Sequence, residues 1–140
     1  MKALQLYILM FFVFNLQINI NAANNCKEIS PDDVIDDVAI TIKNGNSGRL
    51  AAFFSSTIDL LLPGNEGTYS KTQAELIVKD FFSKYPPSNF TIKQRGSSSE
   101  GSKFAIGNYT SAQGKIFRTY FLLKKTNNNF LITLLEFDSE

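Results

Sequence analysis

The feature that most constrains this chain is a change of hydrophobic periodicity at Pro86-Pro87. Before the two prolines, apolar side chains from Ala74 to Tyr85 recur at the spacing of one helix face. After them the period falls to about two residues, which is the period of a strand. Proline ends the helix because it lacks a backbone amide and restricts the residue before it. Helices before this point and strands after it predict an α+β domain.

Two helix starts can be located from capping residues. The segment from Ser70 to Gln73 has the pattern of a capping box, which predicts a helix over 70–85. Ser30 and Pro31 suit an N-cap and a first helical position, so we expect another helix from there to about Ile42, ended by Asn44-Gly45. A short helix is expected over 48–54.

Turn residues divide the rest of the chain into short strands. The connections are short, so the strands after Pro87 are expected to form an antiparallel meander. Because helices come first and strands last, we expect helices packed on one face of a curved antiparallel sheet. The expected strands cover 57–62, 68–69, 89–95, 103–111, 115–125 and 130–137.

The first residues have a different character. Lys2 is followed by an apolar run over 3–14 that is too short to span the ~30 Å core of a bilayer. Such a run behind a positive residue is typical of a secretory signal peptide. We therefore expect a signal peptide over 1–22, a periplasmic or secreted product, and no stable membrane insertion after cleavage.

Small residues mark the expected cleavage site, after Ala22 or Ala23. Residues 23–29 are then a flexible N-terminal segment, and 30–140 form a single domain. Cys26 raises the alternative of a lipid anchor, but the two asparagines before it do not suit lipoprotein processing.

Charge and composition exclude several function classes. Without Lys2 the chain has 13 basic and 13 acidic residues, so no basic surface for nucleic acid is expected. Cys26 is the only cysteine, which rules out an intramolecular disulfide. The chain has no histidine, which removes Ser-His-Asp and Cys-His mechanisms and histidine metal sites. We expect no cofactor and no metal, and we assign no catalytic residue.

Four segments carry a resemblance to known proteins: GRLAAFF, YSKTQAE, DFFSKYPP and GNYTSAQGKIFRTYFLLKK. With these segments and its order of elements, the chain resembles the nuclear-transport-factor-2-like (cystatin-like) fold. More narrowly, over Ser30 to Phe137 it resembles a family of uncharacterised secreted bacterial proteins with that fold. The resemblance implies a cone of sheet and helices, a pocket that hosts isomerases or dehydratases in some members, and dimers formed through the sheet. These motifs concern the fold and do not identify a reaction.

Both faces of the last two expected strands are apolar, although a sheet with helices on one side should be polar on the other. Several large side chains left exposed would forgo on the order of 10 kcal/mol. We expect the second face to be covered by another copy of the chain; the alternative is that the sheet rolls up within one chain. In the strand over 115–125, one face carries Ile116, Tyr120 and Leu122, and the other carries Phe117, Phe121 and Leu123. In the strand over 130–137, one face carries Phe130, Ile132 and Leu134, and the other carries Leu131, Leu135 and Phe137.

Six polar residues are candidates for ligand binding. Arg118 and Tyr120 share one strand parity, and they line the cone if that parity faces the helices. The turn at 112–114 places Asn108 opposite Arg118. An arginine among apolar side chains can bind an anionic ligand or a buried carboxylate such as Glu136. The six candidates are Asp59, Tyr69, Asn108, Arg118, Tyr120 and Glu136.

The sequence favours a non-catalytic binding or interaction module that is homodimeric through its sheet, with a small apolar or anionic ligand as a further partner. The alternative is an isomerase- or dehydratase-like enzyme with a carboxylate and a tyrosine in the cone. A deep pocket that holds Asp59 or Glu136 beside a tyrosine would favour the enzyme. A pocket filled by phenylalanines would favour the interaction module.

Overall fold

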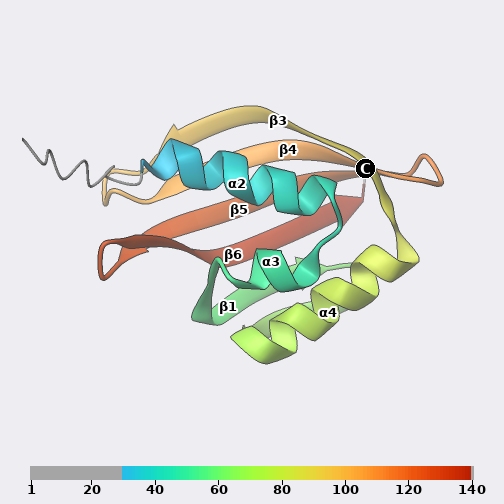
Figure 1. The fold of residues 1–140 in the computed structure, drawn as a ribbon, viewed down its shortest axis with the longest axis horizontal. Coiled ribbons are helices and arrows are strands. Elements are labelled where there is room, and N and C mark those ends of the chain that lie inside the picture. The colour runs from blue at the N-terminus through green and yellow to red at the C-terminus, as the bar shows by residue number, and fades with distance from the viewer. Residues whose placement is uncertain (1–29, 140) are drawn as a thin grey trace, which may run out of the picture.

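The computed structural model describes residues 30–139 (Figure 1). The expected signal peptide, the segment over 23–29 and Cys26 lie outside these residues. The elements in chain order are α2 (Pro31–Lys43), α3 (Ser47–Ala51), β1 (Phe54–Leu62), β2 (Asn65–Ser70), α4 (Lys71–Lys84), β3 (Pro87–Ser97), β4 (Lys103–Ser111), β5 (Ile116–Thr126) and β6 (Asn129–Ser139).

The two long helices begin where their capping residues predict. The Ser30 hydroxyl accepts a hydrogen bond from the Asp32 amide at 3.3 Å, and Pro31 is the first residue of α2. Ser70 and Gln73 form the reciprocal capping box of α4. The short helix is shifted from its expected position: α3 ends at Ala51, because the chain enters β1 at Phe54 and buries that side chain in the core.

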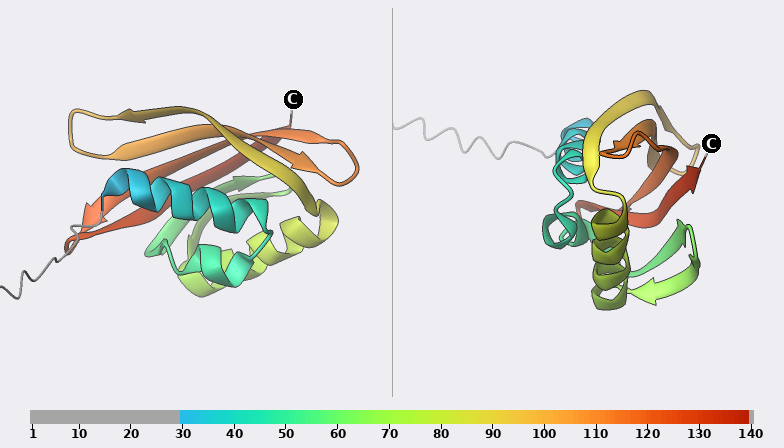
Figure 2. Two further views of the ribbon diagram at one scale, coloured as in Figure 1. Left: turned by 45° about the horizontal axis from the view of Figure 1, so that its top comes forward. Right: turned by 90° about the vertical axis from the view of Figure 1, so that its right-hand side faces the viewer.

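The six strands form one sheet in the order β2-β1-β6-β5-β4-β3. The meander from β3 to β6 is antiparallel, as predicted. β1 joins it beside β6 in a parallel pairing, which brings residues about 75 positions apart in the sequence together. The helices gather on one side of the curved sheet, and the other side, here called the outer face, is turned away from them (Figure 2).

A bulge at Thr133 changes which residues of β6 share a face. Leu122 of β5 lies opposite Leu134, yet the next residue, Leu123, lies opposite Ile132, so Thr133 is an extra residue in β6. Strict alternation would have placed Ile132 and Leu134 on the same face. The bulge instead places Ile132 with the buried residues and leaves Leu134 on the outer face.

The core lies between the sheet and the helices. Buried side chains of α2 and α4 pack against alternate residues of the strands, which include fully buried Phe54, Phe117 and Phe121. Burial of large apolar groups of this kind contributes about 1.5–3 kcal/mol each. Because the helices cover only one side of the sheet, side chains on the outer face are not buried in this core.

Candidate functional site

The structure resolves which parity of β5 faces the helices. Phe117, Thr119 and Phe121 are fully buried against them, so Arg118 and Tyr120 lie on the outer face. The condition under which those two residues would line the cone is therefore not met. The physical reason is that the space beneath the helices is filled by phenylalanines of β5: Phe117 contacts the Phe81 ring of α4, and Phe121 is fully buried on the same side.

Strand register brings most of the candidates together on the outer face. Asn108 lies directly opposite Arg118, as predicted, and Tyr120 lies directly opposite Glu136. Asp59 of β1 lies on the same face, opposite Leu134 of β6, and its carboxylate accepts a hydrogen bond from the Thr68 hydroxyl.

Tyr69 is separated from the other candidates by the sheet. It lies opposite buried Ile58 and packs at the edge of the core, on the helix-facing side. Its hydroxyl donates a long hydrogen bond of 3.5 Å to the Glu66 carbonyl. Tyr69 therefore packs against the core and does not lie with the polar candidates on the outer face.

The Arg118 guanidinium has no ion-pair partner among residues 30–139, although Asp138 of β6 lies directly opposite it. Glu136, which was expected as a buried carboxylate partner for Arg118, lies opposite Tyr120 instead and is partly exposed. The arginine is thus exposed and available to a partner or ligand outside this part of the chain.

Aromatic rings fill the interior of the cone. Phe81 of α4 lies at the centre, with its ring centroid 4.6 Å from that of Phe137 and 5.2 Å from that of Phe117. Tyr109 packs against the same group, 5.3 Å from Phe137. Such close ring contacts leave a packed core at the position where a binding pocket would be expected in this architecture.

The hydroxyls of Tyr109 and Thr119 are among the buried polar groups. The Tyr109 hydroxyl donates a hydrogen bond to the Tyr85 carbonyl, and burial raises the pKa of Tyr109 well above its usual range. The Thr119 hydroxyl is fully buried and has no hydrogen-bond partner among residues 30–139. Neither group is accompanied by a buried carboxylate, so the core lacks the pair of groups that the enzyme alternative requires.

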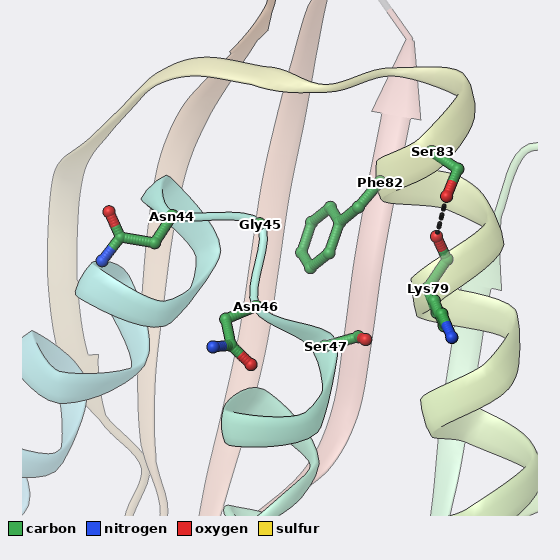
Figure 3. Close-up of a pocket in the computed structure, with 7 residues that line it drawn as sticks. All are labelled: Asn44, Gly45, Asn46, Ser47, Lys79, Phe82 and Ser83. Carbon is green, nitrogen blue, oxygen red and sulfur yellow. Dashed lines mark hydrogen bonds between the residues drawn. The ribbon is translucent and has the colours of Figure 1, made fainter.

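The clefts of the described residues lie on the surface. A cleft of about 380 Å³ separates the α2–α3 turn from α4, with the Phe82 ring at its base and the Ser83 hydroxyl bonded to the Lys79 carbonyl at 2.9 Å (Figure 3). It contains none of the six candidates. A second, of about 330 Å³, lies where β1 and β6 end and includes Glu66, Glu136 and Asp138. No tyrosine lines it.

Metal and membrane sites find no support within residues 30–139. The aspartates and glutamates there form no group of three that could hold a metal ion. No helix in the same part of the chain is long and apolar enough to cross a membrane.

The candidate site is therefore the outer face itself. Leu61 and Ile116 are 37% and 41% exposed, and the Phe104 ring stacks on Tyr120 at 5.9 Å. Sequence reasoning missed Phe104 and Leu61 because it followed only the last two strands, and it missed Asp138 because it ended the last strand at Phe137. Residues of the outer face include Asp59, Leu61, Glu66, Phe104, Ile106, Asn108, Ile116, Arg118, Tyr120, Leu122, Lys124, Leu131, Leu134, Glu136 and Asp138.

Solved structures support both the fold and the family. A DUF4783 family protein from Bacteroides ovatus is 28% identical, with 81% of this chain and 96% of that chain covered and a TM-score of 0.70. A DUF4783 family protein from Bacteroides uniformis is 27% identical, with coverages of 76% and 97% and a TM-score of 0.71. A nuclear-transport-factor-2-like protein of unknown function from Cytophaga hutchinsonii shares 12% identity, 80% and 91% coverage and a TM-score of 0.56, which concerns the fold alone.

No curated protein matches the chain. The family model described as a domain of unknown function (DUF4783) matches residues 35–138, which include nearly all of the described sheet and helices. The resemblance inferred from sequence motifs is thereby confirmed at the level of family and fold, and the chain belongs to the DUF4783 family.

Proposed function

We propose that this protein is an exported, non-catalytic interaction module that forms a homodimer through the outer face of its sheet. The observation that carries the proposal is the contrast between a cone filled with aromatic rings and an outer face that combines apolar side chains with charged ones. A filled cone leaves no room for a substrate, and the carboxylates that an enzyme would use lie on the opposite side of the sheet.

The size of the outer face fits a dimer interface. Six strands spaced ~4.8 Å apart and about nine residues long at ~3.3 Å per residue present roughly 700 Å² of sheet. A standard protein interface buries about 800 Å² on each partner. The area of the outer face is therefore close to the area that one partner buries in a standard interface, so one copy of the same domain can cover it.

The side chains of the outer face also suit an interface. Leu122 and Leu134 face each other across neighbouring strands near its centre, beside the stacked rings of Phe104 and Tyr120. Aromatic residues, arginine and aliphatic side chains inside a polar rim are the usual composition of such surfaces. Leu122 and Leu134 are only partly exposed, so the dimer gains from a few central contacts rather than from a broad exposed patch.

An anionic small ligand is the second candidate for this face, favoured by exposed Arg118, which has no ion-pair partner within residues 30–139. Native mass spectrometry of the mature protein, purified from its own exported compartment, tests both readings. A dimer without added mass supports the interaction module, and a retained small molecule reveals a ligand by its mass. A bare monomer at micromolar concentration would overturn the proposed homodimer.

A pair of matched leucine substitutions locates the interface. Leu122→Asp places a charge at the centre of the outer face, and we expect the dimer dissociation constant to rise by roughly a hundredfold or more. Leu76→Asp makes the same change on α4, where Leu76 is 63% exposed, and should leave the dimer intact. Analytical ultracentrifugation measures both. Dissociation by the Leu76 variant alone would place the interface on the helices.

A further inference from the structure

The seam between β5 and β6 runs through the outer face as a series of directly opposed residues. Along it Arg118 lies opposite Asp138, Tyr120 opposite Glu136, and Leu122 opposite Leu134. Each pair joins groups that attract one another: a cation and a carboxylate, a phenol and a carboxylate, and two leucines. Yet no ion pair joins Arg118 to Asp138 within one chain.

Charge is divided across this seam. The acidic residues of the outer face lie on β2, β1 and β6, whereas its basic residues, Arg118 and Lys124, lie on β5. The acidic residues are Asp59, Glu66, Glu136 and Asp138. One side of the seam is therefore negative and the other carries the positive groups.

This division constrains how a second copy can cover the face. In a symmetric dimer of two sheets packed face to face, the two-fold axis lies in the plane between them. An axis across the strands would place β6 and β1 against their own symmetry mates and oppose like charges, which costs affinity. An axis along the strands exchanges the two sides of the seam, so that negative meets positive.

We propose, building on the homodimer above, that the two-fold axis follows the β5–β6 seam. The Arg118 of each copy then pairs with the second copy's Asp138, Tyr120 with its Glu136, and Leu122 with its Leu134. These matches follow from strand register, because an axis along the seam exchanges the two members of every cross-strand pair.

Sheet twist limits the matching to the centre of the face. Two aligned sheets pack with their strands about 30° apart, so positions on the axis stay in register while the edges diverge. The three seam pairs lie on or beside the axis, whereas Glu66 on β2 lies near the rim. The seam pairs thus determine which partner is accepted, and the rim charges contribute little.

Charge exchange between two chains provides the test. Arg118→Asp opposes two carboxylates at each contact of its homodimer, and Asp138→Arg opposes two guanidinium groups. We expect either variant alone to raise the dimer dissociation constant by roughly tenfold or more. An equimolar mixture should form the heterodimer, in which both contacts are restored. Native mass spectrometry separates the heterodimer from either homodimer by its mass.

Mixing also separates an intermolecular role from a structural one. Arg118→Asp brings two carboxylates together within its own chain as well, but mixing with a second chain cannot relieve that repulsion. Circular dichroism and thermal unfolding of each variant verify folding, and Lys79→Asp on α4 is the control for an equal change of charge. The double variant Arg118→Asp/Asp138→Arg should again form a homodimer.

The outcomes distinguish this inference from the proposed function. Preferential heterodimer formation supports the seam axis. Folded single variants that dimerise like the wild type, with statistical mixing, would overturn the seam axis, while dissociation by Leu122→Asp would still support the homodimer through the sheet. A wild-type chain that is monomeric would overturn both proposals.

Discussion

The two faces of β5 differ far more in structure than in composition. On one face Phe117, Phe121 and Leu123 are fully buried; on the other Ile116 is 41% exposed and Leu122 is only partly covered. Both faces are rich in large apolar side chains, but the helices cover only one. The difference shows that apolar alternation identifies a surface that can be buried, whereas the number of elements in one chain decides how many such surfaces it buries itself.

The largest effect expected within one chain comes from two adjacent residues of this strand. Phe117→Ala removes a ring that contacts Phe81 and Tyr85, and we expect a loss of about 3–5 kcal/mol in the free energy of unfolding. Ile116→Ala, one residue away on the outer face, should cost less than about 1 kcal/mol. Urea denaturation at low protein concentration measures both. Equal losses would contradict the assignment of the two faces.

A smaller effect is expected at the buried phenol of the helix-facing side. Tyr109→Phe leaves the Tyr85 carbonyl without its donor and should cost about 1–2 kcal/mol at neutral pH. The pH dependence has a definite sign. Burial raises the pKa of Tyr109 in the folded chain, so above about pH 10 the unfolded chain ionises while the folded chain stays protonated.

In the wild type the buried Tyr109 phenol therefore contributes to the free energy of unfolding below about pH 10, and this contribution is lost as pH rises towards the pKa of the folded chain. Tyr109→Phe has no phenol and lacks this contribution. The difference in unfolding free energy between the two proteins should narrow between pH 8 and pH 10.5, when followed by urea denaturation. A constant difference would show that the phenol titrates normally in the folded state.

The smallest expected change in the free energy of unfolding is a gain rather than a loss. The Thr119 hydroxyl is fully buried without a hydrogen-bond partner in the described part of the chain. Thr119→Val preserves the shape of the side chain and should therefore stabilise the protein by about 1 kcal/mol. Thr119→Ser retains the hydroxyl and removes a methyl group, so it should destabilise the protein. Thermal unfolding of the two variants measures both changes in stability. A destabilised valine variant would show that the hydroxyl has a hydrogen-bonded role in solution.

Local signals predicted the elements and part of their register. The capping box at Ser70 determines the start of α4, and the turn at 112–114 determines that Asn108 lies opposite Arg118, because both depend only on residues close in sequence. Asn127 and Asn128 adopt positive φ angles in the β5–β6 turn, a backbone that asparagine tolerates well. These features depend on steric and hydrogen-bond rules that act over a few residues.

The candidate site was only partly predictable. Strand alternation placed Arg118 and Tyr120 on the same face of β5. Both faces of that strand are rich in apolar side chains, so the sequence did not show which of them packs against the helices. The bulge at Thr133, which moves Ile132 to the buried side, has no turn residue to mark it. The parallel pairing of β1 with β6 joins segments too far apart for any local pattern to indicate.

By itself, then, the sequence determined the helices, the strand meander, the hairpin register and the family. Tertiary packing alone decided that the phenylalanines of β5 face the helices, that the cone is filled, and that most of the polar candidates gather on the outer face. The physical reason is that backbone geometry and capping are local, whereas the choice between two apolar faces depends on which side chains fill the volume beneath the helices.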